Sequence, residues 1–393
     1  MAGTTPGHDE GTTTRLPAPL YPGAQGVRPG HTAYPVMPKL IRLYPWVQGL
    51  RAIAALSVAF LHVANDAITA GRDPAGWIAA INGFMPWAAG VDIFFVISGF
   101  VIVHASANLF AVPGGGRVFL RRRLIRIVPL YWTMTTLFLA TLLLQRSAVH
   151  GAMGGPGFIL ASYAFLPWPR PDGLMEPALG LGWTLNYEMF FYLVLTPFLR
   201  LPRAWAVLGS AACLALFVAA GQVHGFHAAA LRFWSNPIVL EFVAGMGLAL
   251  AVAHGLTLPG WLRLALVATA CAGLHLMAGA PEPWRALAHG LPGALLVAAA
   301  VAGRRPERST PAMRILVRLG DASYALYLCH PFVMRGFSLL GAHLGPPTAA
   351  SGILYVGLSL ATAQLCALAI NAGFERKLSA MLKGRRWRRA PAG

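Results

Sequence analysis

The apolar runs of this chain constrain its fold more than any other feature. A transmembrane helix needs about 20 consecutive, mainly apolar residues, and we predict that ten stretches of the sequence span a membrane. These predicted spans cover residues 46–66, 84–106, 126–145, 183–200, 204–221, 236–254, 262–279, 286–302, 319–340 and 352–373. Only 11% of the residues are charged, whereas soluble domains carry about 25%. The sequence therefore predicts an all-α polytopic membrane protein.

The positive charge of the chain predicts its orientation. A net charge of +18 could also indicate a nucleic-acid partner, but the basic residues form short clusters between apolar runs, as in the cytoplasmic loops of membrane proteins. Such clusters precede the first, third, fifth and ninth predicted spans and follow the tenth. We therefore predict that both termini are cytoplasmic and that no nucleic acid binds.

The two ends of the chain differ in composition from the part between them. Residues 1–38 are rich in Gly, Pro and Thr and do not have the pattern of a signal peptide, so we expect a disordered cytoplasmic tail. Residues 39–375 form the predicted transmembrane domain, and residues 376–393 a basic cytoplasmic tail. The four cysteines lie in apolar runs and the twelve histidines show no ligand spacing, so we expect no disulfide framework and no metal site.

The first predicted span, "QGLRAIAALSVAFLHVAND", carries ionisable residues inside an apolar run. Arg51 and His62 are 11 residues apart, which places them on one helix face, about 16 Å apart along the axis. The predicted orientation puts Arg51 near the inner surface and His62 beyond the midplane, with Asp66 one turn later. Arg51 could simply reach lipid headgroups, and His62 a polar neighbour. Two ionisable groups on one intramembrane face, however, favour a functional site.

Further polar residues in the predicted spans are candidates for the same site. Asp92, in "GVDIFFVISGF", is a carboxylate inside an apolar run, which is costly in lipid. Glu188, in "GWTLNYEMFFYL", is predicted to lie at a depth similar to that of His62. It could form an acid–base pair with His62 or a structural hydrogen bond to another span. In "LGDASYALYLCHPF", Tyr327 and His330 share a helix face, and His330 is either a functional group or a core histidine.

A cluster of arginines precedes the third predicted span in "GGGRVFLRRRLIRIVPLYW". Its members are Arg121, Arg122, Arg123 and Arg126. Positive charge beside a span is expected from membrane topology alone, and this interpretation is favoured when the segment is considered by itself. The alternative is an anion site, because guanidinium groups match the geometry of phosphate oxygens.

Taken together, these motifs resemble a known family. Arginine and histidine separated by ten residues, "GVDIFFVISGF", "RRRLIRIVPLYW", "GWTLNYEMFFYL" and "LGDASYALYLCHP" occur in this order over residues 40–375. The set resembles the acyltransferase-3 family of bacterial integral membrane O-acyltransferases, and within it the exopolysaccharide-biosynthesis branch. The resemblance implies a multi-pass protein of the bacterial inner membrane.

The resemblance also implies a reaction and roles for residues. An acyl group, usually acetyl, passes from cytoplasmic acyl-CoA to a hydroxyl of an extracytoplasmic glycan. His62 is expected to be the catalytic base, with Glu188 or, as the weaker candidate, Asp66 behind it. Arg51 and the arginines of the third motif are expected to hold the phosphates of acyl-CoA. The residues expected to contact substrates are Asn186, Tyr327, His330 and Asp92, with Asn186 or Tyr327 stabilising the oxyanion.

Several alternatives remain open at this stage. The protein could instead acylate a lipid or a small molecule, or it could be a transporter or flippase, although the sequence shows no repeat symmetry of the kind that transporters have. The acyl group could pass directly to the acceptor or through an acyl-histidine. We expect acceptor specificity to lie in outer loops such as 146–182. The sequence does not predict the oligomeric state.

Overall fold

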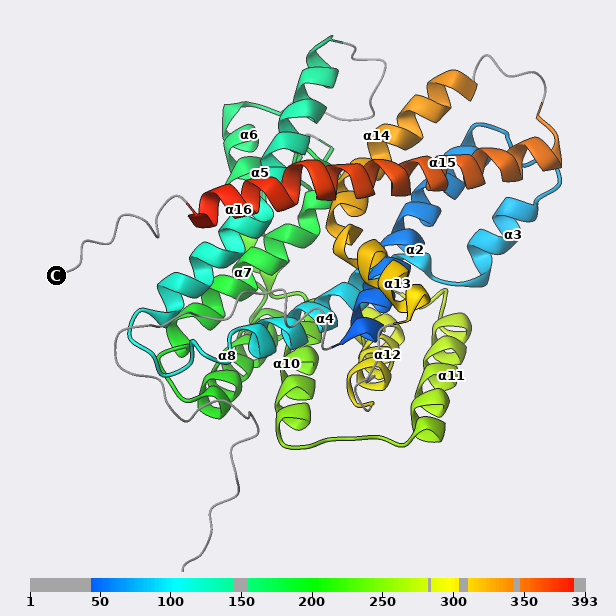
Figure 1. The fold of residues 1–393 in the computed structure, drawn as a ribbon. Coiled ribbons are helices and arrows are strands. Elements are labelled where there is room, and N and C mark those ends of the chain that lie inside the picture. Colours follow the sequence, from blue (N-terminus) through cyan, green and yellow to red (C-terminus); the bar gives the residue numbers. More distant parts are fainter. Residues whose placement is uncertain are drawn as a thin grey trace, which may run out of the picture. The chain divides into compact units, whose positions relative to one another are not determined.

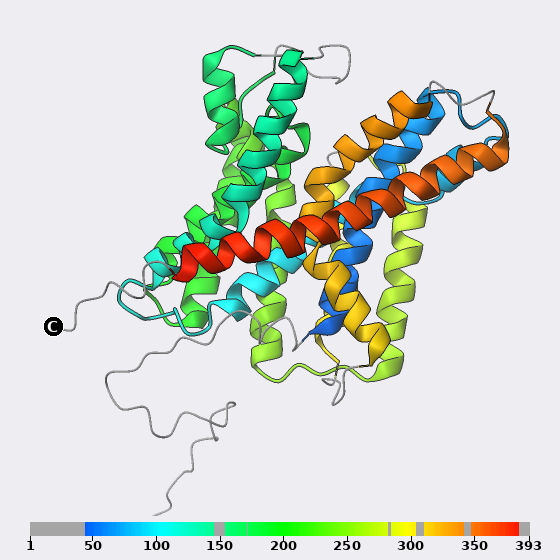
Figure 2. The ribbon, with the colours of Figure 1, turned by 45° about the horizontal axis from the view of Figure 1, so that its top comes forward.

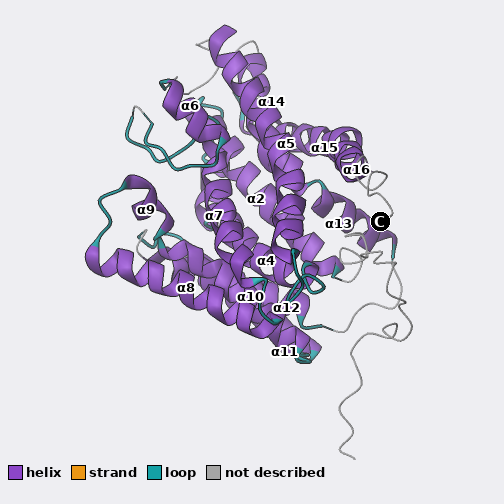
Figure 3. Ribbon diagram, turned by 90° about the vertical axis from the view of Figure 1, so that its left-hand side faces the viewer, coloured by secondary structure: helices purple, strands orange, loops and turns teal. Residues whose placement is uncertain are grey.

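The computed structural model describes residues 44–144, 154–170, 172–281, 284–303, 310–341 and 347–384, and these ranges contain helices and loops but no strand (Figure 3). The α-helices are α2 (Pro45–Thr69), α3 (Trp77–Phe84), α4 (Gly90–Ala105), α5 (Gly115–Leu144), α6 (Pro156–Tyr163), α7 (Trp183–Phe198), α8 (Arg203–His224), α9 (Ala229–Trp234), α10 (Leu240–Ala253), α11 (Gly260–Leu276), α12 (Leu291–Val301), α13 (Pro311–Asp321), α14 (Ser323–Gly341), α15 (Ala349–Ile370) and α16 (Arg376–Gly384). Short 3-10 or π-helical turns adjoin them: η1 (Trp87–Ala89), η3 (Gly180–Gly182), η4 (Pro237–Val239), η6 (Ala286–Gly290) and η7 (Asn371–Glu375). The all-α prediction is confirmed for these residues. The tail predicted at 1–38 and the end of the basic tail, 385–393, lie outside them.

A helix overlaps each of the ten ranges that were predicted to span a membrane. Five helical segments of the described chain are long and apolar enough to cross a bilayer, namely Pro45–Thr69, Trp87–Ala105, Gly115–Leu144, Arg203–His224 and Ala349–Leu382. Shorter apolar helices cover Pro237–Ala253, Gly260–Leu276 and Ala286–Val301. The structure therefore supports a membrane protein, while the count of ten spans and the cytoplasmic termini stay predictions.

Two predicted boundaries are corrected by the structure. The predicted third span began at residue 126, but α5 begins at Gly115, so the arginine cluster is helical and not part of a loop. The predicted ninth span ran over 319–340, but one helix ends at Asp321 and the next begins at Ser323. Close packing accompanies this break, because a Cβ atom on Gly320 would clash with the backbone of Gln48.

The tightest helix contact joins α4 and α10. A Cβ on Gly99 would clash with the carbonyl oxygen of Phe242, and a Cβ on Gly245 would clash with that of Val96. Small residues at such positions let two helix backbones approach closely in a membrane protein. Beside this contact, the Phe242 ring stacks on Phe95 with a centroid distance of 4.6 Å. This packing fixes α4, which lines the candidate site.

Helix α2 occupies a central place in the described chain, packing against α4, α13, α14 and α15. Figures 1 and 2 show α15 and α16 as one long helical path that crosses α14 and reaches α5. Asn371, in η7, donates a hydrogen bond of 3.1 Å to the carbonyl of Asp321, and Arg121 of α5 donates one of 3.2 Å to Leu382 of α16. The C-terminal helices thus connect the N-terminal end of α5 to the helices around α2.

Candidate active site

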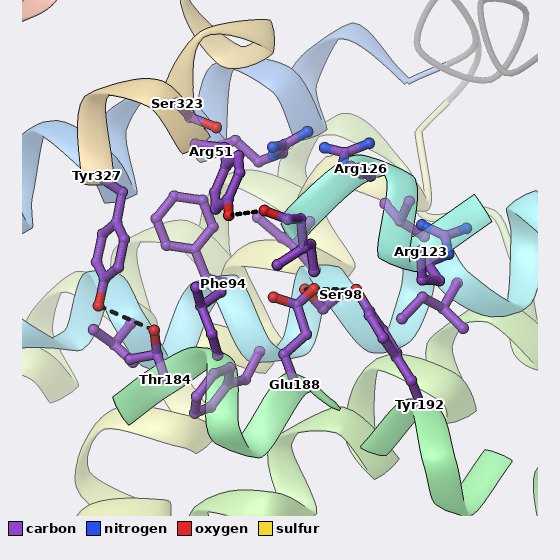
Figure 4. Close-up of a pocket in the computed structure, with 18 residues that line it drawn as sticks. Arg51, Phe94, Ser98, Arg123, Arg126, Thr184, Glu188, Tyr192, Ser323 and Tyr327 are labelled. Carbon is purple, nitrogen blue, oxygen red and sulfur yellow. Dashed lines mark hydrogen bonds between the residues drawn. The ribbon is translucent and has the colours of Figure 1, made fainter. Parts of the chain in front are cut away.

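A pocket lies where α2, α4, α5, α7 and α14 meet, with a cavity volume of about 90 Å³ (Figure 4). Its polar lining residues are Arg51, Ser98, Arg123, Arg126, Thr184, Glu188, Tyr192, Ser323, Tyr324 and Tyr327. Figure 4 shows the three arginines toward one side, with Tyr327 and Thr184 on the other. We call this cavity the arginine pocket. It is narrow, so it suits an extended chain better than a nucleotide.

The three guanidinium groups of the arginine pocket carry an excess of positive charge. Arg51 and Arg123 are 9% and 4% exposed, and Arg123 also lies over the ring of Phe119. Within the described residues, none of the three pocket arginines forms an ion pair. Buried cations without a protein partner are costly, and arginine forks bind phosphate oxygens well. The pocket can therefore receive an anionic ligand.

Of the four clustered arginines that were predicted to bind the donor, Arg123 and Arg126 line this pocket, and Arg121 and Arg122 do not. Helix α5 turns by about 100° per residue, so Arg121 lies about 170° from the direction midway between Arg123 and Arg126, and Arg122 lies about 70° from it. Arg121 is exposed and bonded to the backbone of Leu382, and Arg122 does not line the pocket. The helical character of this segment, which the sequence analysis treated as a loop, explains the difference.

Glu188 is the carboxylate of the arginine pocket, and its hydrogen bonds do not involve His62. It accepts a hydrogen bond of 3.4 Å from the hydroxyl of Ser98 and a short one from Tyr192. Asp66, the other predicted partner of His62, accepts a hydrogen bond of 2.6 Å from Tyr355 and so joins α2 to α15. The structure therefore gives both carboxylates partners other than the imidazole that they were predicted to orient.

His62 lies beside His330, and this contact joins two predicted site residues from distant spans. His330 Nε2 is 3.3 Å from His62 Nδ1, and the two ring centroids are 5.2 Å apart. His330 is fully buried, whereas His62 is partly exposed. The ring of Tyr327 is 6.4 Å from that of His330, so Tyr327 links the arginine pocket to the histidine pair.

Backbone carbonyls fix the tautomers of both histidines. His62 Nδ1 is 2.8 Å from the carbonyl oxygen of Val58, and His330 Nδ1 is 3.1 Å from that of Leu326. A carbonyl oxygen can only accept a hydrogen bond, so each Nδ1 carries the proton when the ring is neutral. The one hydrogen on His62 Nδ1 is then shared between the Val58 carbonyl oxygen, at 2.8 Å, and the lone pair of His330 Nε2, at 3.3 Å, and His62 Nε2 keeps its own lone pair for a substrate proton.

Two predicted substrate contacts lie outside the arginine pocket. Asn186 is 1% exposed, and it is about 200° around α7 from Glu188, so it points away from the pocket. Asp92 is fully buried and bound by Arg285, through bonds of 3.0 Å from Nε and 2.9 Å from Nη2. The buried carboxyl of Glu241 lies beside this ion pair. Both residues are buried, and neither lines the arginine pocket.

Tyr327 lines the pocket, and its hydroxyl already forms hydrogen bonds within the protein. The hydroxyl is 3.1 Å from Thr184 Oγ1 and donates to the carbonyl oxygen of Leu181 at 3.1 Å. These bonds orient the ring at the end of the pocket that leads toward His330. Tyr327 therefore forms the wall between the pocket and the histidine pair, a position that suits a group contacting the acyl chain.

Some residues of the site could not be recognised from the sequence. Glu176, in the loop before α7, is bound by Arg170 through a hydrogen bond of 2.8 Å. Asp321 ends α13, and its ion-pair partner Arg376 lies 3.3 Å away. Burial raises the pKa of the Asp321 carboxyl, while the charges of Arg51 and Arg376 oppose that rise. Each of these contacts joins segments far apart in the sequence, and no local motif marks them.

Comparison with known proteins shows the family of the chain. The model of the acyltransferase-3 family, described as an acyltransferase domain, matches residues 44–371. The exopolysaccharide production protein ExoZ of Rhizobium meliloti (strain 1021) is 33% identical over 313 residues, which cover 76% of this chain and 94% of that protein. Acyltransferase MdmB of Streptomyces mycarofaciens is 31% identical over 337 residues, covering 78% of this chain and 83% of that protein. No solved structure matches the chain significantly. The chain belongs to the acyltransferase-3 family.

Proposed function

We propose that this protein transfers an acyl group, acetyl in the first instance, from cytoplasmic acyl-CoA to a hydroxyl of an extracytoplasmic glycan, and that it resides in the bacterial inner membrane. The observation that carries the proposal is the arrangement along α2. Arg51 lines the arginine pocket, and His62 lies on the same helix about 16 Å further along its axis. Tyr327 and His330 lie between them.

The arginine pocket supports the choice of donor. Coenzyme A carries phosphate groups at one end of a long, thin arm and the acyl thioester at the other. Three arginines with one carboxylate leave the pocket positively charged, and arginine forks suit phosphates. In this proposal the phosphates lie at the arginines while the thin arm extends past Tyr327. The small cavity volume favours such an arm over the nucleotide itself.

The histidine pair supports the chemistry. His62 Nε2 takes the proton of the acceptor hydroxyl, and the acceptor oxygen attacks the thioester carbonyl. The carbon–sulfur bond then breaks, and His62 returns the proton to the departing thiolate, so that an ester and coenzyme A thiol result. The carbonyl oxygen of Val58 and His330 Nε2 share the hydrogen of His62 Nδ1 as acceptors, and both stabilise the charged ring that forms in between. In this mechanism His330, and not Glu188, orients His62.

The loop before α7 supports an acceptor site on the side of His62. Residues 154–182 include α6 and were predicted to face outward as part of 146–182. Ser162 ties this segment together, since its hydroxyl accepts from the backbone N–H of Ala178 and its carbonyl accepts from Tyr131. The Arg170–Glu176 pair of this segment offers donors and acceptors for hydroxyl groups. The similarity to an exopolysaccharide production protein supports a glycan over a lipid or a small molecule.

Mass spectrometry of surface glycans tests the proposal directly. Cells that carry the His62→Ala variant should lose one acyl mass from a glycan, whereas cells with the wild-type protein retain it. Immunoblotting of the membrane fraction provides the control that the variant still inserts. Full acylation by the variant would refute the role of His62. An unchanged glycan profile with loss of acylated lipids or small molecules would refute the glycan acceptor but not acyl transfer.

The same variant distinguishes direct transfer from an acyl-histidine intermediate. Purified protein is incubated with labelled acyl-CoA in the absence of acceptor, and label attached to the protein is measured. Label on the wild-type protein that is absent from His62→Ala favours the two-step route. Protein that stays unlabelled while transferring label once acceptor is added favours direct attack.

A further inference from the structure

A second cavity lies on the face of α2 opposite the arginine pocket. It is a groove of about 610 Å³ bounded mainly by α2, α11, α12 and the segment around η1. Ile53 lines it and is about 200° around the helix from Arg51. Ile53, Leu264 and Val267 are 57%, 71% and 37% exposed, so the groove opens to the surroundings of the protein. In a membrane, those surroundings are lipid.

The groove has the length and chemistry of a hydrocarbon chain. It runs along α11 from Gly260 to Leu274, about 21 Å at 1.5 Å per residue. One leaflet contributes about 15 Å to the hydrocarbon core of a bilayer, so one extended acyl chain fits lengthwise. The lining is aliphatic and aromatic apart from Ser57, Cys271 and one charged side chain, Arg263.

Arg263 lies at one end of this groove, where its guanidinium group can bind an anion. Its Nε donates a hydrogen bond of 2.6 Å to the carbonyl oxygen of Ala299, which fixes the guanidinium plane. Within the described residues, its two terminal nitrogens have no hydrogen-bond or ion-pair partner. The N-terminal end of α11, with unpaired N–H groups, begins at Gly260 in the same lining. Trp261, beside it, is 72% exposed, and tryptophan is enriched at the level of lipid headgroups.

We propose that this groove binds an anionic phospholipid, with one acyl chain along α11 and the phosphate at Arg263 and the N-terminus of that helix. No carboxylate lines the groove, so the ammonium group of a zwitterionic lipid finds no partner there. The occupant is therefore selected by net charge as well as by its chain. A lipid in this position packs against the face of α2 opposite the one that carries Arg51.

The two exposed cysteines allow a direct test with the full chain. Cys271 lines the groove, whereas Cys213 lies on α8 outside it, and both are exposed. The purified protein is placed in mixed micelles with phosphatidylglycerol or with phosphatidylcholine of the same chains, and modification of each thiol by N-ethylmaleimide is followed by mass spectrometry. Phosphatidylglycerol should slow modification of Cys271 about tenfold more than phosphatidylcholine does, because the arginine adds charge-assisted bonds. The rate at Cys213 should be the same in both.

Variants connect the protection to the charged end of the groove. Arg263→Gln should abolish the difference between the two lipids, whereas Arg232→Gln, which changes an exposed arginine on α9, should preserve it. Val267→Trp should fill the groove and remove the lipid dependence while leaving Arg263 in place. Equal protection by both lipids, protection by inorganic phosphate alone, or unchanged selectivity in Arg263→Gln or Val267→Trp would each overturn the proposal.

Discussion

Two buried groupings of arginine and carboxylate in this protein differ in how their charges are matched. At Asp92, one guanidinium, that of Arg285, binds a fully buried carboxylate through two hydrogen bonds, and the buried carboxyl of Glu241 beside them adds no charge when it is protonated. In the arginine pocket, three guanidiniums surround Glu188, and none of them forms an ion pair within the described residues. The comparison separates two uses of intramembrane charge. A matched pair holds helices together, whereas an unmatched set is arranged for a ligand of the opposite charge.

The matched pair should produce the largest effect on stability. Arg285→Met leaves the Asp92 carboxylate buried without its cation, which should lower the free energy of unfolding by about 3 kcal/mol or more. Arg285→Lys keeps the charge but loses the planar fork, so its loss should be smaller. Thermal unfolding in detergent measures both, and Arg232→Met, at an exposed site, is the matched control with a change below about 0.5 kcal/mol. If Arg285→Met kept wild-type stability but lost activity, the Asp92–Arg285 pair would have to be assigned to the active site.

Substitution of an arginine of the arginine pocket should instead weaken the binding of acyl-CoA. Arg123→Gln should raise the KM for acyl-CoA roughly 10- to 100-fold with little change in kcat, because a charge-assisted hydrogen bond to the donor contributes about 1.5–3 kcal/mol. Its thermal stability should not fall as that of Arg285→Met does, since an unpaired buried cation is removed.

Arg121→Gln is the control for that experiment, on the same helix and with the same change of charge. Arg121 is exposed and bonded to the backbone of Leu382, so its KM should stay within about twofold of wild type. An equal rise of KM in both variants would show that the arginines act through the overall charge of α5, and the distinction between the pocket and its surroundings would be lost.

The histidine pair allows a test of positioning that leaves donor binding unchanged. His330→Leu should lower kcat about tenfold with KM unchanged, because His62 loses the acceptor that orients its ring. His330→Gln, whose amide oxygen can accept a hydrogen bond, should restore part of kcat. Cys329→Ala, at the neighbouring buried residue, is the packing control. A matching loss in all three variants would indicate that the site is sensitive only to packing.

The sequence predicted the helices and the main members of the site because both depend on local patterns. Apolar runs determine where helices form, and helical periodicity placed Arg51 and His62 on one face, as well as Tyr327 and His330. The pocket then gathers Arg51, Glu188 and Tyr327 from three helices, a grouping that the family resemblance implied.

Partners between distant segments could not be derived in the same way. Arg285 lies 193 residues from Asp92 and His330 lies 268 residues from His62, and helix packing alone decides which polar groups meet. A related reason separates the members of the arginine cluster: once the segment is helical, residues one position apart point in different directions, and only Arg123 and Arg126 of the cluster line the pocket. Glu188 was predicted to orient His62 from its depth, but depth does not determine the direction in which a side chain points.

The smallest expected effect concerns Glu188, and it tests whether this carboxylate acts on the donor site or on His62. Glu188→Gln keeps the size of the side chain and the oxygen that accepts from Ser98 and Tyr192, but it removes the negative charge from the arginine pocket. The KM for acyl-CoA should fall about threefold, because the three cations lose their internal counter-charge, and kcat should stay near wild type. Ser98→Ala is the control that keeps the carboxylate and should leave KM unchanged. If Glu188 instead acted through His62, as its predicted depth suggested, kcat would fall by about two orders of magnitude or more. The arginine pocket would then take part in acid–base catalysis as well as in binding the donor.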